Sequence, residues 1–341
     1  PEDASCKEAA LDLADKGCKI VFADSFGHES YMLEAAKEAP DVQFCHATGT
    51  TAHTANVKNF HNAFASIYEG RYLAGVAAGL KLNEMIKDGK IKAEEAKIGY
   101  VGAFTYAEVI SGYTSFFLGA RSICPTATME VQFTGSWYDE TAEKEAATTL
   151  IANKCVLISQ HADSMGAPTA CENAKVPNVS YNGSTIKACP NTFIVSSRID
   201  WAPYYEYIIG CVKDGKEIDT DWTGTLATGS VVLTEVNDKA AAAGTAEKIE
   251  AVKADIESGK IHVFDTSKFT VTVDAAKGLN ANAKIDADGH LTSYMADVNT
   301  DEKFEGDTEV VKDGFFAEST FRSAPYFDIK IDGITLLNTK F

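Results

Sequence analysis

The densest group of chemically capable side chains is the run Gln160-His161-Ala162-Asp163-Ser164, which comes after the apolar residues CVLI. Amide, imidazole, carboxylate and hydroxyl groups are costly beside a buried strand unless something pairs with them. A carboxylate accepts hydrogen bonds from an amino or ring N–H group, while Gln and His donate or accept. Two alternatives remain open: Ser164 or Asp163 caps the following helix, or His161 and Asp163 act as an acid–base pair, although no nucleophile is evident nearby.

Aromatic residues follow several other apolar runs of the chain. Two flat faces about 7 Å apart sandwich a planar heteroaromatic ring, an arrangement that suits purines. Alternatively, each aromatic side chain covers the core of its own lobe. A ligand role is favoured for Phe26 and Trp137, because each follows a strand directly. The full set of aromatic candidates is Phe26, Tyr106, Trp137, Tyr138 and Trp201.

Polar residues in the same loops complete the candidate set. Asn182, in Asn182-Gly183, either turns the chain or offers its amide to a ligand. Glu108 either contacts the ligand or bridges two lobes, and Asp200 stands beside Trp201 in the run RIDWAPYYEY. We therefore predict a ligand site built from Phe26, Tyr106, Glu108, Trp137, Gln160, His161, Asp163, Asn182, Asp200 and Trp201, with no catalytic residue.

The elements that would position these residues alternate between strands and helices. Apolar periodicity predicts strands at 18–24, 42–47, 97–103, 127–133, 155–160, 178–182 and 192–197. It predicts helices at 3–17, 30–39, 62–87, 111–122, 140–153, 165–175 and 202–214. Such alternation is typical of right-handed βαβ units around a parallel sheet, whose loops meet at the carboxyl ends of the strands. We expect the candidate residues to share one cleft there.

The two ends of the chain depart from this pattern. The opening segment predicts a helix with no strand before it, so we expect a preceding β-α segment of the fold to lie outside these residues. After about residue 216, SVVLTEV and IHVFD look like strands around a helix at 245–260. FTVTVD, AKIDADGHLTSYM and FDIKIDGITLL predict β hairpins or an edge extension. The expected lobes are 1–104 with 198–222, and 105–197 with 223–341.

Composition excludes several function classes. The 341 residues carry a formal net charge of −18, which disfavours nucleic acid as a partner. No apolar stretch approaches the length of a membrane span. The sequence holds no dinucleotide, P-loop, zinc-protease or serine-hydrolase motif, so no cofactor or metal is expected. Eight scattered cysteines favour buried thiols and a reducing or oxygen-poor setting, with a Cys171–Cys189 disulfide left open.

The chain resembles the basic membrane protein family, the purine-nucleoside receptors among the substrate-binding lipoproteins of ABC importers. The resemblance extends from Pro1 to about Phe264 and rests on IVFADSFGHE, VQFCHATG, FASIYEGRYLAGVAAG, the SWYDE block, LISQHADS and SSRIDWAPYY. It implies a type I periplasmic-binding-protein fold, with two doubly wound parallel-sheet lobes joined by three crossover strands and here a β-rich C-terminal extension. Family members bind a purine base or nucleoside between the lobes and are not enzymes.

The resemblance also implies residue roles and a location. Phe26 matches the aromatic that stacks on the base. A family aspartate is replaced by Thr105, the aspartate that holds ribose by Asn182, and the lysine that binds ribose by Ile199 or its neighbour Arg198. Trp137 and Asp163 resemble base contacts of an adenine-binding branch. The implied protein is a monomer, lipid-anchored outside the cytoplasm, that delivers its ligand to an ABC permease. A nucleoside-processing enzyme using His161 and Asp163, and a binding protein for a sugar or amino acid, are the alternatives.

Overall fold

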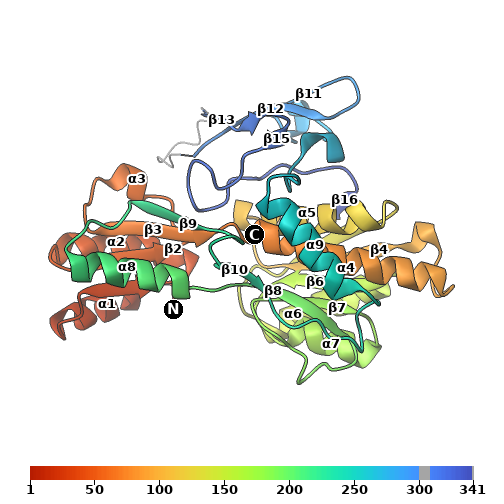
Figure 1. Cartoon of the computed structure of the whole chain (residues 1–341), viewed down its shortest axis with the longest axis horizontal. Helices are drawn as coiled ribbons and strands as arrows, with labels where there is room; N and C mark the ends of the chain where they lie inside the picture. Colours follow the sequence, from red (N-terminus) through yellow and green to blue (C-terminus); the bar gives the residue numbers. More distant parts are fainter. Residues whose placement is uncertain (299–307, 340–341) are drawn as a thin grey trace.

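The computed structural model describes residues 1–298 and 308–339 and divides them between two lobes and an extension (Figure 1). The first lobe contains a four-stranded parallel sheet in the order β1-β2-β3-β9. Its strands are β1 (Ile20–Ala23), β2 (Gln43–Ala47), β3 (Phe60–Ala65) and β9 (Asp221–Gly224). Its helices are α1 (Ser5–Asp15), α2 (Glu29–Glu38), α3 (Ala52–Ala55) and α8 (Ala202–Asp214), with a 3₁₀ turn, η1 (Phe26–His28), directly after β1.

The second lobe contains a seven-stranded sheet in the order β10-β8-β7-β6-β4-β5-β16, parallel except for β10. Its strands are β4 (Lys97–Gly102), β5 (Thr128–Phe133), β6 (Leu157–His161), β7 (Asn178–Tyr181), β8 (Phe193–Ile199), β10 (Val231–Leu233) and β16 (Ile334–Leu336). The helices are α4 (Ile67–Lys87), α5 (Ala107–Ile123), α6 (Glu140–Ala152), α7 (Gly166–Ala174) and α9 (Thr245–Glu257), with a 3₁₀ turn η2 (Ala93–Glu95). The chain crosses between the lobes after β3, β8 and β9, so the two-lobed parallel fold expected from sequence is confirmed.

The lobe boundary differs from the expectation. Strand β4 belongs to the second sheet, so the first crossover lies at Ser66 instead of near residue 104. The predicted helix 62–87 also begins later, because residues 60–65 form β3 and α4 starts at Ile67. All six residues of β3 are buried. A parallel strand buried on both faces has no polar alternation, which is why it resembled the start of the following apolar helix.

Helices α4 and α5 form the centre of the second lobe, and small residues bring their backbones together. A Cβ atom added at Gly75 would lie 2.0 Å from the carbonyl oxygen of Phe116, and one at Gly119 would lie 2.1 Å from that of Tyr72. Only glycine permits this approach. The side chains of Leu73 and Val76 are fully buried in the resulting core.

The C-terminal extension covers one side of the junction between the lobes (Figure 1). It contains β11 (Ala283–Ile285), β12 (Leu291–Ala296), β13 (Thr308–Glu309), β14 (Val311–Lys312) and β15 (Phe315–Phe316), besides the turns η3 (Thr266–Lys268) and η4 (Ala275–Lys277). The expected β11–β12 hairpin and the edge strand β16 are present. The segments 261–265 and 269–274, expected as strands, make only the isolated bridges Asp265–Phe315 and Asp274–Leu279.

The eight cysteines are free thiols, and six of them are buried. Burial raises the pKa of the Cys45 and Cys155 thiols to about 12 and that of Cys189 to about 11. These cysteines pack as small apolar side chains, as expected. Cys171 and Cys189 form no disulfide.

Candidate functional site

A cavity of about 320 Å³ lies between the two lobes, where the strands of both sheets end. The first lobe contributes residues that follow β1 and β2, and the second contributes residues at the ends of β6, β7 and β8. This position is the one expected for ligands in open α/β sheets. The lining residues are Asp24, Ser25, Phe26, Ala47, Thr48, Phe64, Glu108, Trp137, His161, Asp163, Tyr181, Asn182, Ile199 and Trp201.

Polar side chains of the second lobe form one wall of the cavity. His161, the last residue of β6, is 1% exposed, and its Nε2 atom lies 3.4 Å from Oε1 of Glu108 at the start of α5. Asn182, which follows β7, has a φ of 62° and donates through Nδ2 to Oδ1 of Asp163 at 2.7 Å. The N–H of Asp163 donates to the carbonyl of Trp137 at 3.0 Å. The ends of β6 and β7 and the start of α5 therefore position the imidazole, both carboxylates and the amide.

The charge of the cavity is predominantly acidic. Three carboxylates line it, from Asp24, Glu108 and Asp163, against one imidazole, from His161. Partial burial raises the pKa of Asp163, whereas its hydrogen bond from Asn182 and the nearby His161 act in the opposite direction. Such a wall favours a ligand with N–H or O–H donors and disfavours phosphate-bearing ligands.

The aromatic wall is continuous across both lobes. Phe26 of the first lobe stacks on Tyr106 of the second, with ring centroids 4.9 Å apart and planes inclined by 28°. Tyr106 in turn stacks on Phe104, and Trp137 packs edge-on against Phe104 at 5.0 Å. Trp201 packs against the first-lobe core, 6.4 Å from Phe64. Of these rings, Phe26 and Phe64 on the first-lobe side and Trp137 and Trp201 line the cavity itself.

A buried cation lies behind the polar wall. Arg71, in α4, is fully buried and its guanidinium lies 5.0 Å from the ring centre of Tyr181. Tyr181 lies 4.4 Å from the ring centre of His161. Arg71 donates to the hydroxyl of Tyr100 and, at 3.2 Å, to the carbonyl of Gln160, and no ion pair is recorded for it in residues 1–298 and 308–339. Its charge therefore faces the acidic cavity through two aromatic rings.

Most of the predicted site residues meet at this cavity. Seven of the ten line it: Phe26, Glu108, Trp137, His161, Asp163, Asn182 and Trp201. Tyr106 lies behind Phe26, while Gln160 is 2% exposed and accepts a hydrogen bond from the Asn178 amide at 2.9 Å. Asp200 accepts from the N–H of Ala202 at 3.0 Å, outside the lining.

The alternatives for the polar run are also clarified. Ser164 accepts from the N–H of Gly166 at 3.0 Å, so it helps to begin α7, whereas Asp163 does not cap this helix. The only hydrogen-bonding side chain recorded for His161 within the described residues is Glu108, not Asp163. Sequence reasoning did not select Asp24, Thr48 or Tyr181. The position of Asp24 just after a strand was the available signal, but Tyr181 resembled core.

Residues 1–298 and 308–339 contain neither a metal-binding cluster nor a helix suited to span a membrane. No group of three or more His, Cys, Asp or Glu side chains in these ranges is arranged to hold a metal ion. None of the helices in these ranges combines the length and the apolar character that crossing a bilayer requires.

Known proteins resemble the chain in sequence and in fold. A family model described as ABC transporter substrate-binding protein PnrA-like matches residues 2–267. A purine-binding protein of Brucella abortus is 34% identical over 63% of this chain and 57% of its own. A proposed ABC transporter glucose-binding protein of Haloferax volcanii is 32% identical over 73% of this chain and 62% of its own. The chain thus spans about six-tenths of the length of these curated relatives.

Solved structures support the same fold. A solute-binding protein of an ABC transporter system from Aeropyrum pernix superposes with a TM-score of 0.62 at 17% identity, over 81% of this chain and 84% of its own. One from Conexibacter woesei has a TM-score of 0.59 at 20% identity, over 76% and 84%. At these identities the likeness concerns the type I binding-protein fold alone. Because the family model covers most of the chain, the chain belongs to the PnrA-like family of ABC transporter substrate-binding proteins, which are not enzymes.

Proposed function

We propose that this chain is the extracytoplasmic substrate-binding component of an ABC importer and that its interlobe cavity binds a purine base or nucleoside, with adenine favoured. The observation that carries the proposal is the combination of acidic and aromatic walls around about 320 Å³. Adenine presents an exocyclic amino group and a ring N–H to carboxylates, and its flat faces suit Trp137 and Phe26. The purine-binding relative supports the same class of ligand.

The free base is favoured over the nucleoside. Asn182, which stands where the resemblance implies a ribose-holding carboxylate, already donates its amide to Asp163 at 2.7 Å. Ile199, at another ribose-related position, is apolar and lines the cavity. A ribose hydroxyl placed beside Ile199 would lose its hydrogen bonds with water without replacement. A lipid anchor, a monomeric state and delivery to a membrane permease complete the proposal.

A sugar is the second candidate ligand. The proposed glucose-binding relative from Haloferax volcanii is 32% identical, and carboxylates beside aromatic faces also accept hydrogen bonds from sugar hydroxyls. The two candidate ligands should depend on Asp163 to different degrees. The amino group and ring N–H of adenine lie on one edge and match fixed carboxylates, whereas a pyranose presents hydroxyls around its whole rim.

Calorimetric titration with adenine, adenosine and glucose tests the proposal. We expect adenine to bind most tightly and glucose to give no heat of binding. Thermal unfolding in the same ligands provides an independent measure, since a ligand that binds only the folded state raises the melting temperature. Stabilisation by glucose without any by purines would refute the purine assignment. Chromatography of the adenosine mixture serves as a check, because release of free base would mean an enzyme.

A further inference from the structure

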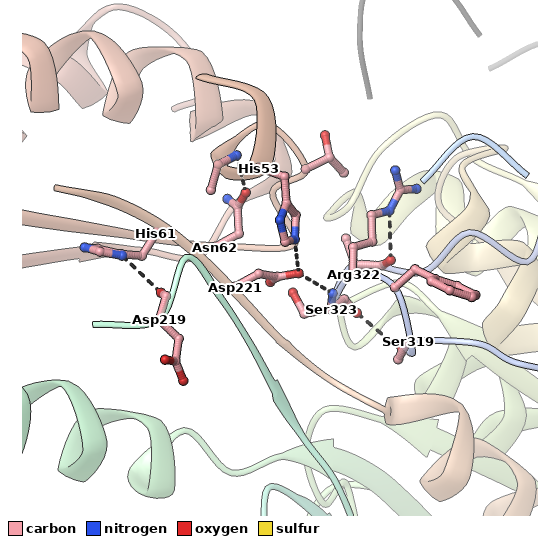
Figure 2. A network of polar contacts seen from close by, with 12 residues as sticks. His53, His61, Asn62, Asp219, Asp221, Ser319, Arg322 and Ser323 are labelled. Carbon is pink, nitrogen blue, oxygen red and sulfur yellow. Dashed lines mark hydrogen bonds and ion pairs between the residues drawn. The ribbon is translucent and has the colours of Figure 1, made fainter. Parts of the chain in front are cut away.

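The polar contact between the first lobe and the C-terminal extension is centred on Asp221 (Figure 2). Asp221 begins β9 and pairs in register with Asn62 of β3, so it belongs to the first-lobe sheet. Its Oδ2 atom accepts a hydrogen bond from the backbone N–H of Ser323 at 2.6 Å. The same oxygen lies 3.0 Å from Nε2 of His53, in α3.

The segment 317–327, which carries Ser323, is anchored on the second lobe. Glu318 is 4% exposed and accepts from the N–H groups of Tyr326 at 2.7 Å and Phe327 at 2.8 Å, which closes the segment into a loop. The ring of Phe327 stacks on that of Phe264 at 4.3 Å, and the hydroxyl of Tyr68, in α4, donates to the carbonyl of Glu318 at 3.4 Å. Movement of the second lobe therefore carries this loop with it.

The contact with Asp221 is shielded from water, which strengthens it. The side chain of Asp221 is 7% exposed and Ser323 is fully buried. Arg322 is 9% exposed and donates to the carbonyls of Ala324 and Pro325, both at 3.1 Å, while its charge acts on Asp221 at longer range. A hydrogen bond to a carboxylate in such surroundings is stronger than one between neutral groups.

We propose that Asp221 is a positioning residue, which fastens the loop 317–327 to the first lobe and so fixes the angle between the lobes at which the ligand cavity forms. The residues involved lie outside the cavity lining. The loop also lies beyond residues 2–267, the part matched by the family model. The expected effect of Asp221 on ligand affinity rests on the proposed function. Its expected effect on the angle between the lobes does not depend on any ligand.

The first experiment measures the ligand-free protein. Small-angle X-ray scattering of Asp221→Ala should give a larger radius of gyration than the wild type, because the lobes can open further. Asp221→Asn, which keeps an acceptor oxygen, should stay close to the wild type. Asp41→Ala, which removes an exposed carboxylate of the same lobe, is the matched control. Scattering of Asp221→Ala that superposes on the wild type would overturn the proposal.

The second experiment uses the wild-type chain, so it does not depend on a variant that folds. Hydrogen exchange with and without adenine should show protection both in the cavity loops and in the segment 317–327. Protection of the cavity loops alone would refute the proposed role of Asp221 and the loop 317–327, while leaving the proposed function intact. If adenine protects no segment, the proposed function fails. Scattering of the ligand-free variants then tests by itself whether Asp221 fixes the angle between the lobes. We expect Asp221→Ala to bind adenine about tenfold more weakly, through a smaller binding-competent fraction.

Discussion

Replacing Asp163 by Asn should weaken the binding of adenine but slightly raise the stability of the ligand-free protein. The substitution keeps the shape of the side chain and the oxygen that accepts from Asn182 at 2.7 Å, but removes the negative charge. Partial burial raises the pKa of Asp163, so the folded state holds the proton more tightly than the unfolded state does. The stability this group contributes is therefore present at low pH and lost as the pH rises through its folded-state pKa.

The two effects differ in size. At pH 7 the ionised Asp163 costs the ligand-free protein some stability, so Asp163→Asn should raise its melting temperature slightly; the side chain remains open to solvent through the cavity, which keeps this gain small. Binding should suffer more. A hydrogen bond to a charged group contributes about 1.5–3 kcal/mol, which corresponds to about 10- to 150-fold weaker binding of adenine.

Calorimetric titration and thermal unfolding at pH 7 check this prediction together. Asp200→Asn is the control, because Asp200 also follows a strand but does not line the cavity, and it should change neither quantity. Unchanged affinity in Asp163→Asn would remove Asp163 from the ligand site. A lower melting temperature without ligand would refute the argument that burial of its charge is unfavourable.

Three further predictions concern the cavity wall, a half-buried carboxylate of α4 and the His53–Asp221 pair of the first lobe. Trp137→Ala should weaken adenine binding at least tenfold in calorimetry, from a loss of about 1.5 kcal/mol of stacking, whereas Tyr138→Ala, at a position 66% exposed, should leave it unchanged. Burial raises the pKa of Glu69 to about 7, so the free energy of unfolding should fall as the pH rises towards 7. Urea unfolding at pH 5 and pH 8 should show a smaller fall for Glu69→Gln than for the wild type. Equal falls would contradict this argument. The hydrogen bond with Asp221 raises the pKa of His53. The stability that this pair gives to the folded protein is therefore full below about pH 6.5 and is lost as the pH rises through the folded-state pKa. Urea unfolding of His53→Ala should lack this part of the pH dependence, and a profile equal to that of the wild type would contradict the pairing.

Close to strand ends, the sequence predicted residues that line the cavity, and their role in binding a ligand stays a prediction. His161 ends β6, whereas Phe26 and Trp137 lie three and four residues after the ends of β1 and β5, and each of the three lines the cavity. The sequence failed where the orientation of a side chain decides the outcome. Gln160 and His161 are neighbours in β6, and successive side chains of a strand point to opposite faces, so Gln160 turns towards Asn178 instead.

Long-range contacts explain the other differences. No local pattern indicates that Asp221 accepts a hydrogen bond from Ser323, 102 positions later. Tyr106 is predicted to contact the ligand because it is an aromatic residue in a loop after an apolar strand, but one face of its ring is covered by Phe26 from the other lobe. Such pairings depend on how the lobes are set against each other, which periodicity along the chain does not encode.

The edge strand β16 has a consequence for the order in which the protein assembles during synthesis. Ile334 pairs with Met129 in β5, and Asn338 accepts from and donates to the backbone of Phe133, 205 positions earlier. The second sheet therefore cannot reach its full width until nearly all of these residues have left the ribosome. Until then the backbone of β5 is an unpaired edge, open to pairing with other chains. Ribosome-bound chains that stop before residue 334 should thus be more prone to aggregate than released ones.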